Sequence, residues 1–254
     1  MTLEIFNTIC LIWGIVAVLT FVLLQFVDAP YGRHIKKGWG PELSNKLGWL
    51  IMEFPSFGII LYFFIHSNQS NYASLLSLLW LFHYFNRTFI FPFRIRTSGK
   101  KMPLIIVLSA IFFNFINAGL NGYFLANFET YTDNSFLNKN FFIGISFFIM
   151  GFIINQISDN ILINLRKPGE LGYKIPRGFL FNFVSCPNLL GELIQWLGFA
   201  MMAWNFPATS FFVWTAANLI PRAIGHHKWY KKHFDDYPKN RGALIPNIWY
   251  SFKK

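Results

Sequence analysis

The sequence predicts an all-α, multi-pass integral membrane protein with seven transmembrane helices. Of its 254 residues, 54% are hydrophobic and only 13% are charged, whereas about a quarter of a soluble domain is charged. The apolar stretches are long, and a helix that crosses the hydrocarbon core needs about 20 such residues. The breaks between these stretches are alternately rich and poor in Lys and Arg. Composition and charge pattern therefore predict the same fold class.

Each predicted span lies between two polar or breaker-rich segments. No basic residue precedes the first apolar stretch and no small-residue cleavage pattern ends it, so it is predicted to be a retained span and not a signal peptide. Pro207 follows a tight turn at Trp204 and Asn205, and the last two spans could alternatively form a short hairpin. No repeat or soluble segment is apparent, so residues 1–254 are predicted to form one membrane-embedded domain. The predicted spans are 5–27, 47–66, 72–93, 103–125, 141–163, 188–205 and 207–224.

The distribution of Lys and Arg predicts the orientation. The breaks at 28–46, 94–102 and 164–187 carry four of these residues each, and the tail after 221 carries eight. The N-terminus and the breaks at 67–71, 126–140 and 205–207 carry none, none, one and none. Because cytoplasmic loops retain positive charge, the N-terminus is predicted to lie outside, in the lumen or periplasm, and the C-terminus in the cytoplasm. The membrane would be the bacterial inner membrane or the endoplasmic reticulum, depending on the source.

The same pattern excludes several function classes. The net charge of +11 lies in short loops beside apolar stretches, which indicates topology and lipid headgroups and not a nucleic-acid partner. Cys10 and Cys186 are assigned to opposite membrane faces, so no disulfide is expected, and no metal site is predicted. No dinucleotide fingerprint or phosphate-binding loop is present. No Lys lies inside a span, which excludes a retinal Schiff base.

Polar residues inside the spans recur at helical spacing. An ionisable residue at membrane depth costs roughly 2.5–3.5 kcal/mol on insertion scales. Interhelical hydrogen bonding would explain one such stripe, but five stripes that include acids and bases indicate a polar cavity, which is by default a ligand site. Tyr84 lies beside Thr88 on the face next to the His83 stripe. The stripes are Glu53; His83, Asn86 and Arg87; Asn155, Ser158 and Asp159; Asn188, Glu192 and Gln195; and Arg222, His226 and Tyr230.

Depth divides these residues into two groups. Glu53 and Tyr84 lie in the middle of their predicted spans, whereas the stripes of the fifth and sixth spans and of the tail lie toward the cytoplasmic side. A site of this form suits a long bipolar ligand whose phosphates stay at the mouth while its reactive end reaches the membrane interior. The basic residues at that mouth are Arg94, Arg96, Lys100, Lys101, Arg166, Lys167, Lys174 and Arg177.

These motifs make the chain similar to the steroid 5α-reductase (3-oxo-5α-steroid 4-dehydrogenase) family, most closely its type 2 enzyme. The likeness covers nearly the whole chain, and about 105–254 resembles the family's reductase C-terminal domain. Its most specific segments are EFPSF at 53–57, HYFNRTF at 83–89, LRKPGE at 165–170, YKIP at 173–176, NLLGE at 188–192, FDDYPK at 234–239 and ALIP at 243–246.

The resemblance implies an NADPH-dependent membrane enzyme that reduces the Δ4 double bond of a 3-oxo steroid, such as testosterone or progesterone, to the 5α-dihydro product. By this likeness Glu53 and Tyr84 are the catalytic pair that holds the 3-keto oxygen. The steroid would arrive from the bilayer. The residues that match the NADPH site are Asn155, Asp159, Arg166, Tyr173, Asn188, Glu192, Arg222, His226 and Tyr230, with further contacts at Tyr31, Arg87, Arg96 and Lys101.

The chemistry of the catalytic pair follows from its functional groups. Hydride transfer to steroid C5 places negative charge on the ketone oxygen, and a donor fixed there stabilises the transition state more than the ground state. Tyr84 offers an O–H. Glu53 in apolar surroundings can stay protonated and donate or share a proton with Tyr84. The donor of the C4 proton stays open between water and a side chain.

Several other functions compete with this one. A membrane methyltransferase of the isoprenylcysteine carboxyl methyltransferase type would use S-adenosylmethionine, but methyl transfer needs no donor at a ketone. The sterol C14-reductase group also uses NADPH and usually has more spans. From a different class, the chain could be a non-enzymatic lipid- or sterol-binding protein or a transporter, although a transporter would be expected to show repeat symmetry. The sequence does not assign an oligomeric state, and a monomer is compatible with it.

Overall fold

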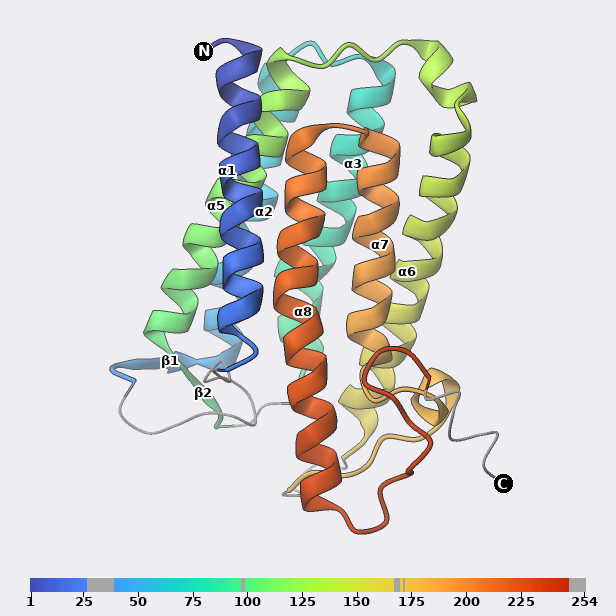
Figure 1. The fold of residues 1–254 in the computed structure, drawn as a ribbon. Helices are drawn as coiled ribbons and strands as arrows, with labels where there is room; N and C mark the ends of the chain where they lie inside the picture. The colour runs from blue at the N-terminus through green and yellow to red at the C-terminus, as the bar shows by residue number, and fades with distance from the viewer. Residues whose placement is uncertain (27–38, 97–98, 167–169, 171, 247–254) are drawn as a thin grey trace.

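The fold is a bundle of long helices that run along a common axis (Figure 1). Residues 1–26, 39–96, 99–166, 170 and 172–246 are described by a computed structural model. The long helices are α1 (Leu3–Leu23), α2 (Asn45–His66), α3 (Asn71–Phe85), α5 (Leu104–Asn127), α6 (Lys139–Asn164), α7 (Pro187–Ala203) and α8 (Phe206–His233). The short elements are β1 (Glu42–Ser44), the π-helical turn η2 (Asn86–Ile90), α4 (Phe91–Arg94), β2 (Lys101–Pro103), and the 3₁₀ turns η3 (Asp133–Leu137) and η4 (Phe179–Asn182).

Every predicted span coincides with a helical segment of the bundle. Among the described residues, α1, α2, α5 and α6 are each long and apolar enough to cross a membrane. The 15-residue α3 and the 17-residue α7 are shorter. The chain is therefore mostly helical with four candidate membrane-spanning helices, while the count of seven crossings stays a prediction.

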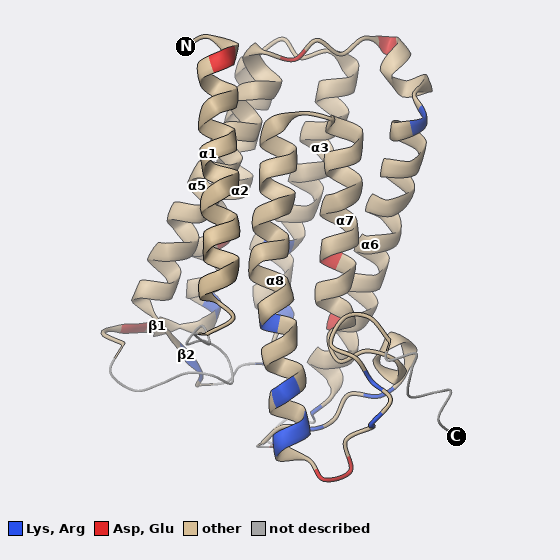
Figure 2. Cartoon of the chain, viewed as in Figure 1, with Lys and Arg blue, Asp and Glu red and all other residues tan. Residues whose placement is uncertain are grey.

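The described basic side chains gather at one end of the bundle. Figure 2 shows Lys and Arg around the small sheet, the lower part of α8 and the connection before α7. The N-terminus and the connections from α2 to α3 and from α5 to α6 lie at the opposite end (Figure 1). β1 pairs with β2 in antiparallel register, with Glu42 opposite Pro103, at the basic end. The alternation of charge read from the sequence thus corresponds to two opposite ends of the molecule.

Helices α6 and α7 pack with their backbones in contact. A Cβ atom added at Gly151 would lie 2.3 Å from the backbone nitrogen of Gln195, and one added at Gly191 would lie 2.5 Å from that of Asn155. No side chain fits at those distances, so the two glycines allow the close approach that small residues give membrane helices. This contact sets Asn155 of α6 against the first turns of α7.

The third predicted span is not one regular helix. The sequence predicts a helix over 72–93, whereas the structure has α3, the π-helical turn η2 and then α4. The N–H of Phe91 bonds to the carbonyl of Asn86, five residues back. Pro92 has no N–H to continue the α-helical pattern, and π-turns of this kind recur at functional sites. The turn changes which way the residues after Phe85 face.

The predicted turn between the last two spans is confirmed, and both flanking segments are full helices. Trp204 ends α7 in the left-handed conformation, with φ of 44°. The side chain of Asn205 accepts a hydrogen bond from the Ala208 N–H at 2.9 Å and caps α8. The structure therefore does not form the alternative short hairpin. Helix α8 has 28 residues and runs past the predicted end of its span at 224 to His233.

Among the described residues, four apolar clusters hold the bundle. In the largest one, Trp80 of α3 packs against Trp196 of α7 and Phe211 of α8, with ring centroids 5.0 and 4.6 Å away. A smaller core near the basic end includes Cys186 and Leu244. Cys10 in α1 and Cys186 before α7 are both buried, and neither is joined to the other.

Candidate active site

Five ionisable side chains from five helical segments converge inside the bundle. Arg87 of η2 interacts electrostatically with Glu192 of α7, Glu53 of α2 and Asp159 of α6. Arg222 of α8 lies within electrostatic reach of Glu53 and Asp159. These groups balance one another's charge, which an apolar bundle requires of ionisable residues. Four predicted stripes and η2 therefore contribute to one cluster.

Arg87 is held at the centre of this cluster on three sides. Its Nη1 lies 3.6 Å from Oδ2 of Asp159. Its guanidinium carbon lies 4.7 Å from the ring centroid of Trp49 and 4.6 Å from that of Phe91. Cation–π contacts of this kind are strongest where water is excluded, so Arg87 is a fixed cation in the interior.

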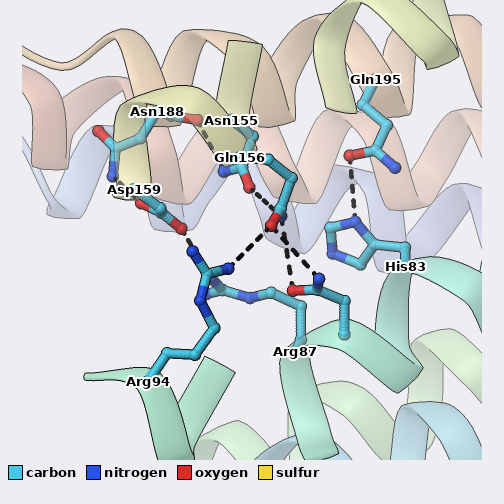
Figure 3. Close-up of polar contacts among 9 residues, drawn as sticks. His83, Arg87, Arg94, Asn155, Gln156, Asp159, Asn188 and Gln195 are labelled. Atoms are coloured by element: carbon cyan, nitrogen blue, oxygen red, sulfur yellow. Dashed lines mark hydrogen bonds and ion pairs between the residues drawn. The ribbon is translucent and has the colours of Figure 1, made fainter. Parts of the chain in front are cut away.

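A chain of amide and acid groups joins α6 to the start of α7 (Figure 3). The side-chain amide of Asn155 donates to the backbone carbonyl of Asn188 at 3.0 Å, and the side chain of Asn188 donates to Oδ1 of Asp159 at 3.1 Å. Oδ2 of Asp159 and Oγ of Ser158 are buried and have no hydrogen-bond partner among the described residues. A buried polar atom without a hydrogen bond costs about 1–3 kcal/mol, so these two atoms are candidates for a bond to a ligand.

Gln156 was not among the candidate residues, yet it connects the network. Its Oε1 accepts from Nδ2 of Asn86 at 3.3 Å and from Nη1 of Arg94 at 3.4 Å, and its Nε2 donates to Oδ1 of Asn155 at 3.1 Å (Figure 3). Both groups of its amide are therefore used. Gln156 follows Asn155 directly and lies off the i, i+3, i+4 stripe, which is why stripe spacing does not select it.

Tyr84 lies within electrostatic reach of Glu53, the residue that the resemblance pairs with it. Tyr84 is 5% exposed and packs on Trp80 and Trp196, with ring centroids 5.3 and 5.8 Å apart. It interacts electrostatically with Glu53 and Glu192. No hydrogen bond joins Tyr84 to Glu53 in the described part of the chain. The phenol and the carboxyl group are thus near each other, and neither occupies the other's hydrogen-bonding capacity.

Glu53 has a polar neighbour that was not selected from the sequence. Nδ2 of Asn114, on α5, donates to the carbonyl of Met52 at 2.6 Å, and Asn114 also lies close to the Glu53 carboxyl. The fourth predicted span was assigned no polar stripe. Its buried residues Asn114, Asn117 and Asn121 follow helical spacing and could have been found by the same criterion.

The side chains of His83, Asn86 and Arg87 all have partners on the packed pair of helices α6 and α7. Nδ1 of His83 lies 3.1 Å from Oε1 of Gln195 on α7, whereas Asn86 bonds to Gln156 on α6 and Arg87 turns to the carboxylate on α6 (Figure 3). The π-helical turn begins at Asn86 and rotates the following residues out of α-helical register.

The predicted basic mouth is assembled in part. Arg166 donates to the carbonyl of Gly172 at 3.0 Å, and its guanidinium lies 5.8 Å from the ring of Tyr173. Nζ of Lys100 lies 5.2 Å from the same ring. Arg96 donates to the backbone carbonyl of Arg166 at 3.1 Å. Tyr173 thus stands between two cations.

Two further residues at the mouth, Lys101 and Tyr31, were also predicted to contact the cofactor. Lys101 is exposed in β2, opposite Ser44, and its neighbour Lys100 is the residue that meets Tyr173. Tyr31 lies outside the described residues. The role expected for Lys101 therefore receives no support from these contacts.

The α8 stripe leads from the cluster toward the C-terminal tail. Arg222 belongs to the cluster, and His226 follows one turn later. Tyr230 is 3% exposed and stacks on Tyr237 of the tail, with ring centroids 5.3 Å apart and planes 7° apart. The aromatic ring of Tyr230 therefore contacts the tail. The spacing of the α8 stripe does not predict this contact. In the described part of the chain no group of three His, Cys, Asp or Glu residues could hold a metal ion.

Comparison with known proteins gives one consistent result. Residues 100–249 match the family described as 3-oxo-5-alpha-steroid 4-dehydrogenase. The chain is 41% identical over 252 residues to "Steroid 5-alpha-reductase DET2" of Solanum lycopersicum, covering 97% of this chain and 98% of that protein. It is 38% identical over 239 residues to "3-oxo-5-alpha-steroid 4-dehydrogenase 1" of Rattus norvegicus, covering 92% of each. The human protein of the latter name is 37% identical over 223 residues, covering 86% of each.

Proposed function

The chain belongs to the 3-oxo-5-alpha-steroid 4-dehydrogenase family, and from this membership we propose that it reduces the Δ4 double bond of a 3-oxo steroid to the 5α-dihydro product, with NADPH as reductant. It is accordingly a membrane enzyme of the oxidoreductase class. The observation that carries the finer proposal is the convergence of Tyr84 and Glu53 with the buried network of Asn155, Asn188 and Asp159. A phenol and a carboxyl group thereby adjoin polar atoms that lack a partner.

The donor and acceptor set fits NADPH. Oδ2 of Asp159 and Oγ of Ser158, both buried without a hydrogen bond, suit the carboxamide end of a nicotinamide. The cations beside Tyr173 suit phosphate groups, which Arg binds with two hydrogen bonds. When bound, NADPH supplies the hydride. The residues proposed to hold it are Asn155, Asp159, Arg166, Tyr173, Asn188, Glu192, Arg222, His226 and Tyr230, with Arg87 and Arg96 as further contacts.

Tyr84 and Glu53 are proposed to hold the 3-keto oxygen of the steroid. Negative charge develops on that oxygen as C5 is reduced, so an O–H that points at it stabilises the transition state. Tyr84 is buried among Trp80 and Trp196, which restrains its ring and excludes water. Because hydrogen bonds strengthen in such a low-dielectric site, two donors there are more effective than they would be in water.

The proposal includes a topology and a route for the substrate. We infer seven crossings, with the N-terminus outside and the basic end in the cytoplasm, supported by the charge segregation of Figure 2. A steroid partitions into lipid, so it would enter sideways between helices, while the charged reductant enters from the cytoplasm. One domain would hold both sites.

The deciding experiment incubates the purified protein with radiolabelled testosterone and either NADPH or NADH. The expected result is a 5α-dihydro product formed with NADPH. A parallel incubation with S-adenosylmethionine and an isoprenylcysteine substrate tests the competing reading. Transfer of a methyl group, or binding of the steroid without reduction by either nucleotide, would contradict the proposed function.

A further inference from the structure

The C-terminal tail after α8 is attached to the chain just before α7. The N–H groups of Ser185 and Cys186 donate to the carbonyls of Gly242 and Ala243 at 2.9 and 3.1 Å, and the N–H of Gly242 donates to the carbonyl of Phe183 at 3.2 Å. Figure 1 shows the tail turning back from the end of α8 toward the start of α7. The tail therefore bridges α7 and α8, which together supply five of the proposed cofactor contacts.

The hydroxyl of Ser185 lies at the centre of this attachment. Ser185 is 2% exposed. Its Oγ lies 2.6 Å from the hydroxyl of Tyr237, 2.7 Å from Nδ1 of His227 and 3.0 Å from the carbonyl oxygen of Gly242. These three partners come from the tail and from α8, so one oxygen atom joins the start of α7 to both.

The number of available protons determines the direction of each of the three hydrogen bonds to Ser185 Oγ. A hydroxyl has one hydrogen to donate and two lone pairs to accept with. The carbonyl of Gly242 can only accept, so Ser185 must donate to it. Tyr237 and His227 must then both donate, which requires the His227 proton on Nδ1. In this state the hydroxyl of Ser185 is fully used.

The surroundings favour a neutral His227. This residue lies beyond the predicted span that ends at 224. Burial lowers its pKa below the ordinary value, and the nearby Lys231 lowers the pKa further. A neutral imidazole has one N–H, and the bond to Ser185 selects the nitrogen that carries it. The other nitrogen then remains an acceptor.

Packing around the junction leaves little freedom. Tyr237 stacks on Tyr230 of α8, and the guanidinium carbon of Arg241, itself only 3% exposed, lies 5.3 Å from the Tyr237 ring. Cys186 and Leu244 are buried in one apolar cluster. Loss of the Ser185 hydroxyl would leave buried donors that water cannot easily reach.

We propose that Ser185 is a positioning residue whose hydroxyl, with His227 and Tyr237, sets α7 and α8 in the register that binds the nicotinamide cofactor. Ser185 precedes Asn188 by three residues, His227 follows His226, and Tyr237 fixes the ring of Tyr230. The junction thus lies next to three of the proposed cofactor contacts, Asn188, His226 and Tyr230. This inference rests on the proposed function.

The test is a double-mutant cycle with Ser185→Ala and Tyr237→Phe. The second change keeps the ring stack on Tyr230 and removes only the hydroxyl. Each variant is expected to weaken NADPH binding about tenfold while the KM for the steroid stays within about twofold. Since both substitutions break the same junction, the double variant should be no more than about twofold weaker than either single one. Binding, both KM values, kcat and thermal unfolding are measured on the purified full chain.

Matched controls remove the same groups elsewhere. Ser146→Ala deletes an exposed hydroxyl that bonds to the carbonyl of Phe142 within α6, and Tyr62→Phe deletes an exposed phenol. Both should leave NADPH binding unchanged. Unaltered binding in Ser185→Ala and Tyr237→Phe, additive losses, or equal losses for both substrates would overturn the inference. If instead the wild-type chain reduces no steroid with NADPH, the proposed function fails first.

Discussion

Two clusters of polar residues in this molecule, one partly buried and one buried, differ in what they leave unused. At the end that holds the N-terminus, Glu129 accepts from the N–H and hydroxyl of Ser70 at 2.9 and 3.1 Å and from the N–H of Tyr131 at 2.9 Å. The hydroxyl of Tyr131 donates to the carbonyl of Ala203 at 2.5 Å and accepts from Asn205 at 2.8 Å. Every group in that cluster serves another part of the chain.

The cluster around Asp159 is chemically similar but incomplete. One oxygen of Asp159 and the hydroxyl of Ser158 are buried without a hydrogen bond, and Arg87 reaches the same carboxylate only at 3.6 Å. Polar residues inside a helical bundle are therefore not diagnostic of a site by themselves. Unused hydrogen-bonding capacity beside a convergence of charged groups supports a ligand site there, whereas an isolated unused group such as Arg241 in the tail does not.

The largest expected effect lies beside the incomplete cluster. Tyr84→Phe keeps the ring between its two tryptophans and removes only the hydroxyl, so we expect kcat to fall by about 10²–10³-fold, as when one oxyanion donor is deleted. Glu53→Gln should also lower turnover strongly. The dissociation constant of NADPH should change little in either variant. Steady-state kinetics and nucleotide binding check this, and unchanged turnover in both variants would remove the assigned roles.

The comparison is tested directly by the same chemical change at each cluster. Asp159→Asn places an amide where Arg87 now meets a carboxylate, and we expect NADPH to bind roughly 10–100-fold more weakly, the size of a lost hydrogen bond to a charged group. Isothermal titration with NADPH measures it. Binding at the wild-type level would show that the unused oxygen of Asp159 receives nothing from the cofactor.

Arg166→Ala should have a smaller effect at the mouth. Arg166 is partly exposed, and screening by solvent weakens a phosphate contact there, so we expect about a tenfold loss of NADPH affinity with kcat at saturation nearly unchanged. The affinity should also become less dependent on salt. Lys139→Ala, at the opposite end of the bundle, is the matched control. An unaltered NADPH dissociation constant in Arg166→Ala would refute its role.

The smallest effect on catalysis is expected from Glu129→Gln. An amide cannot accept all three of the bonds that Glu129 accepts, so the free energy of unfolding should fall by about 1–3 kcal/mol. Burial raises the pKa of the Tyr131 hydroxyl above its ordinary value, which keeps that group a donor at any working pH. Turnover per folded molecule should equal that of the wild type. A loss of NADPH affinity in this variant would contradict the structural role assigned to the Glu129 cluster.

Hydropathy and charge predict the number and order of the helical segments because lipid and membrane potential act on every residue independently. The helices α1, α2, α5 and α6 follow the predicted spans within a few residues. Polar stripes at helical spacing also identify most of the cluster, since a charge inside a bundle requires partners. The pairing of Glu53 with Tyr84 was inferred from the resemblance, and the two side chains do lie together.

What the sequence does not predict depends on contacts between distant segments. The π-helical turn at Asn86 arises from the local geometry before Pro92, and it interrupts the single helix predicted over 72–93. Gln156 gains its role only when Asn86 and Arg94, 70 and 62 residues away, face it across the bundle. The junction at Ser185 unites residues 42 and 52 positions apart. Residue spacing along a single helix does not predict such contacts between distant segments.

The contact between Gly151 and Gly191 has a mechanical consequence. With peptide groups of α6 and α7 touching, neither helix can slide or twist past the other without a collision of main-chain atoms. The two helices must move as one rigid body that carries Asn155 and Asn188 together. A motion that admits or releases ligands therefore has to leave this contact intact.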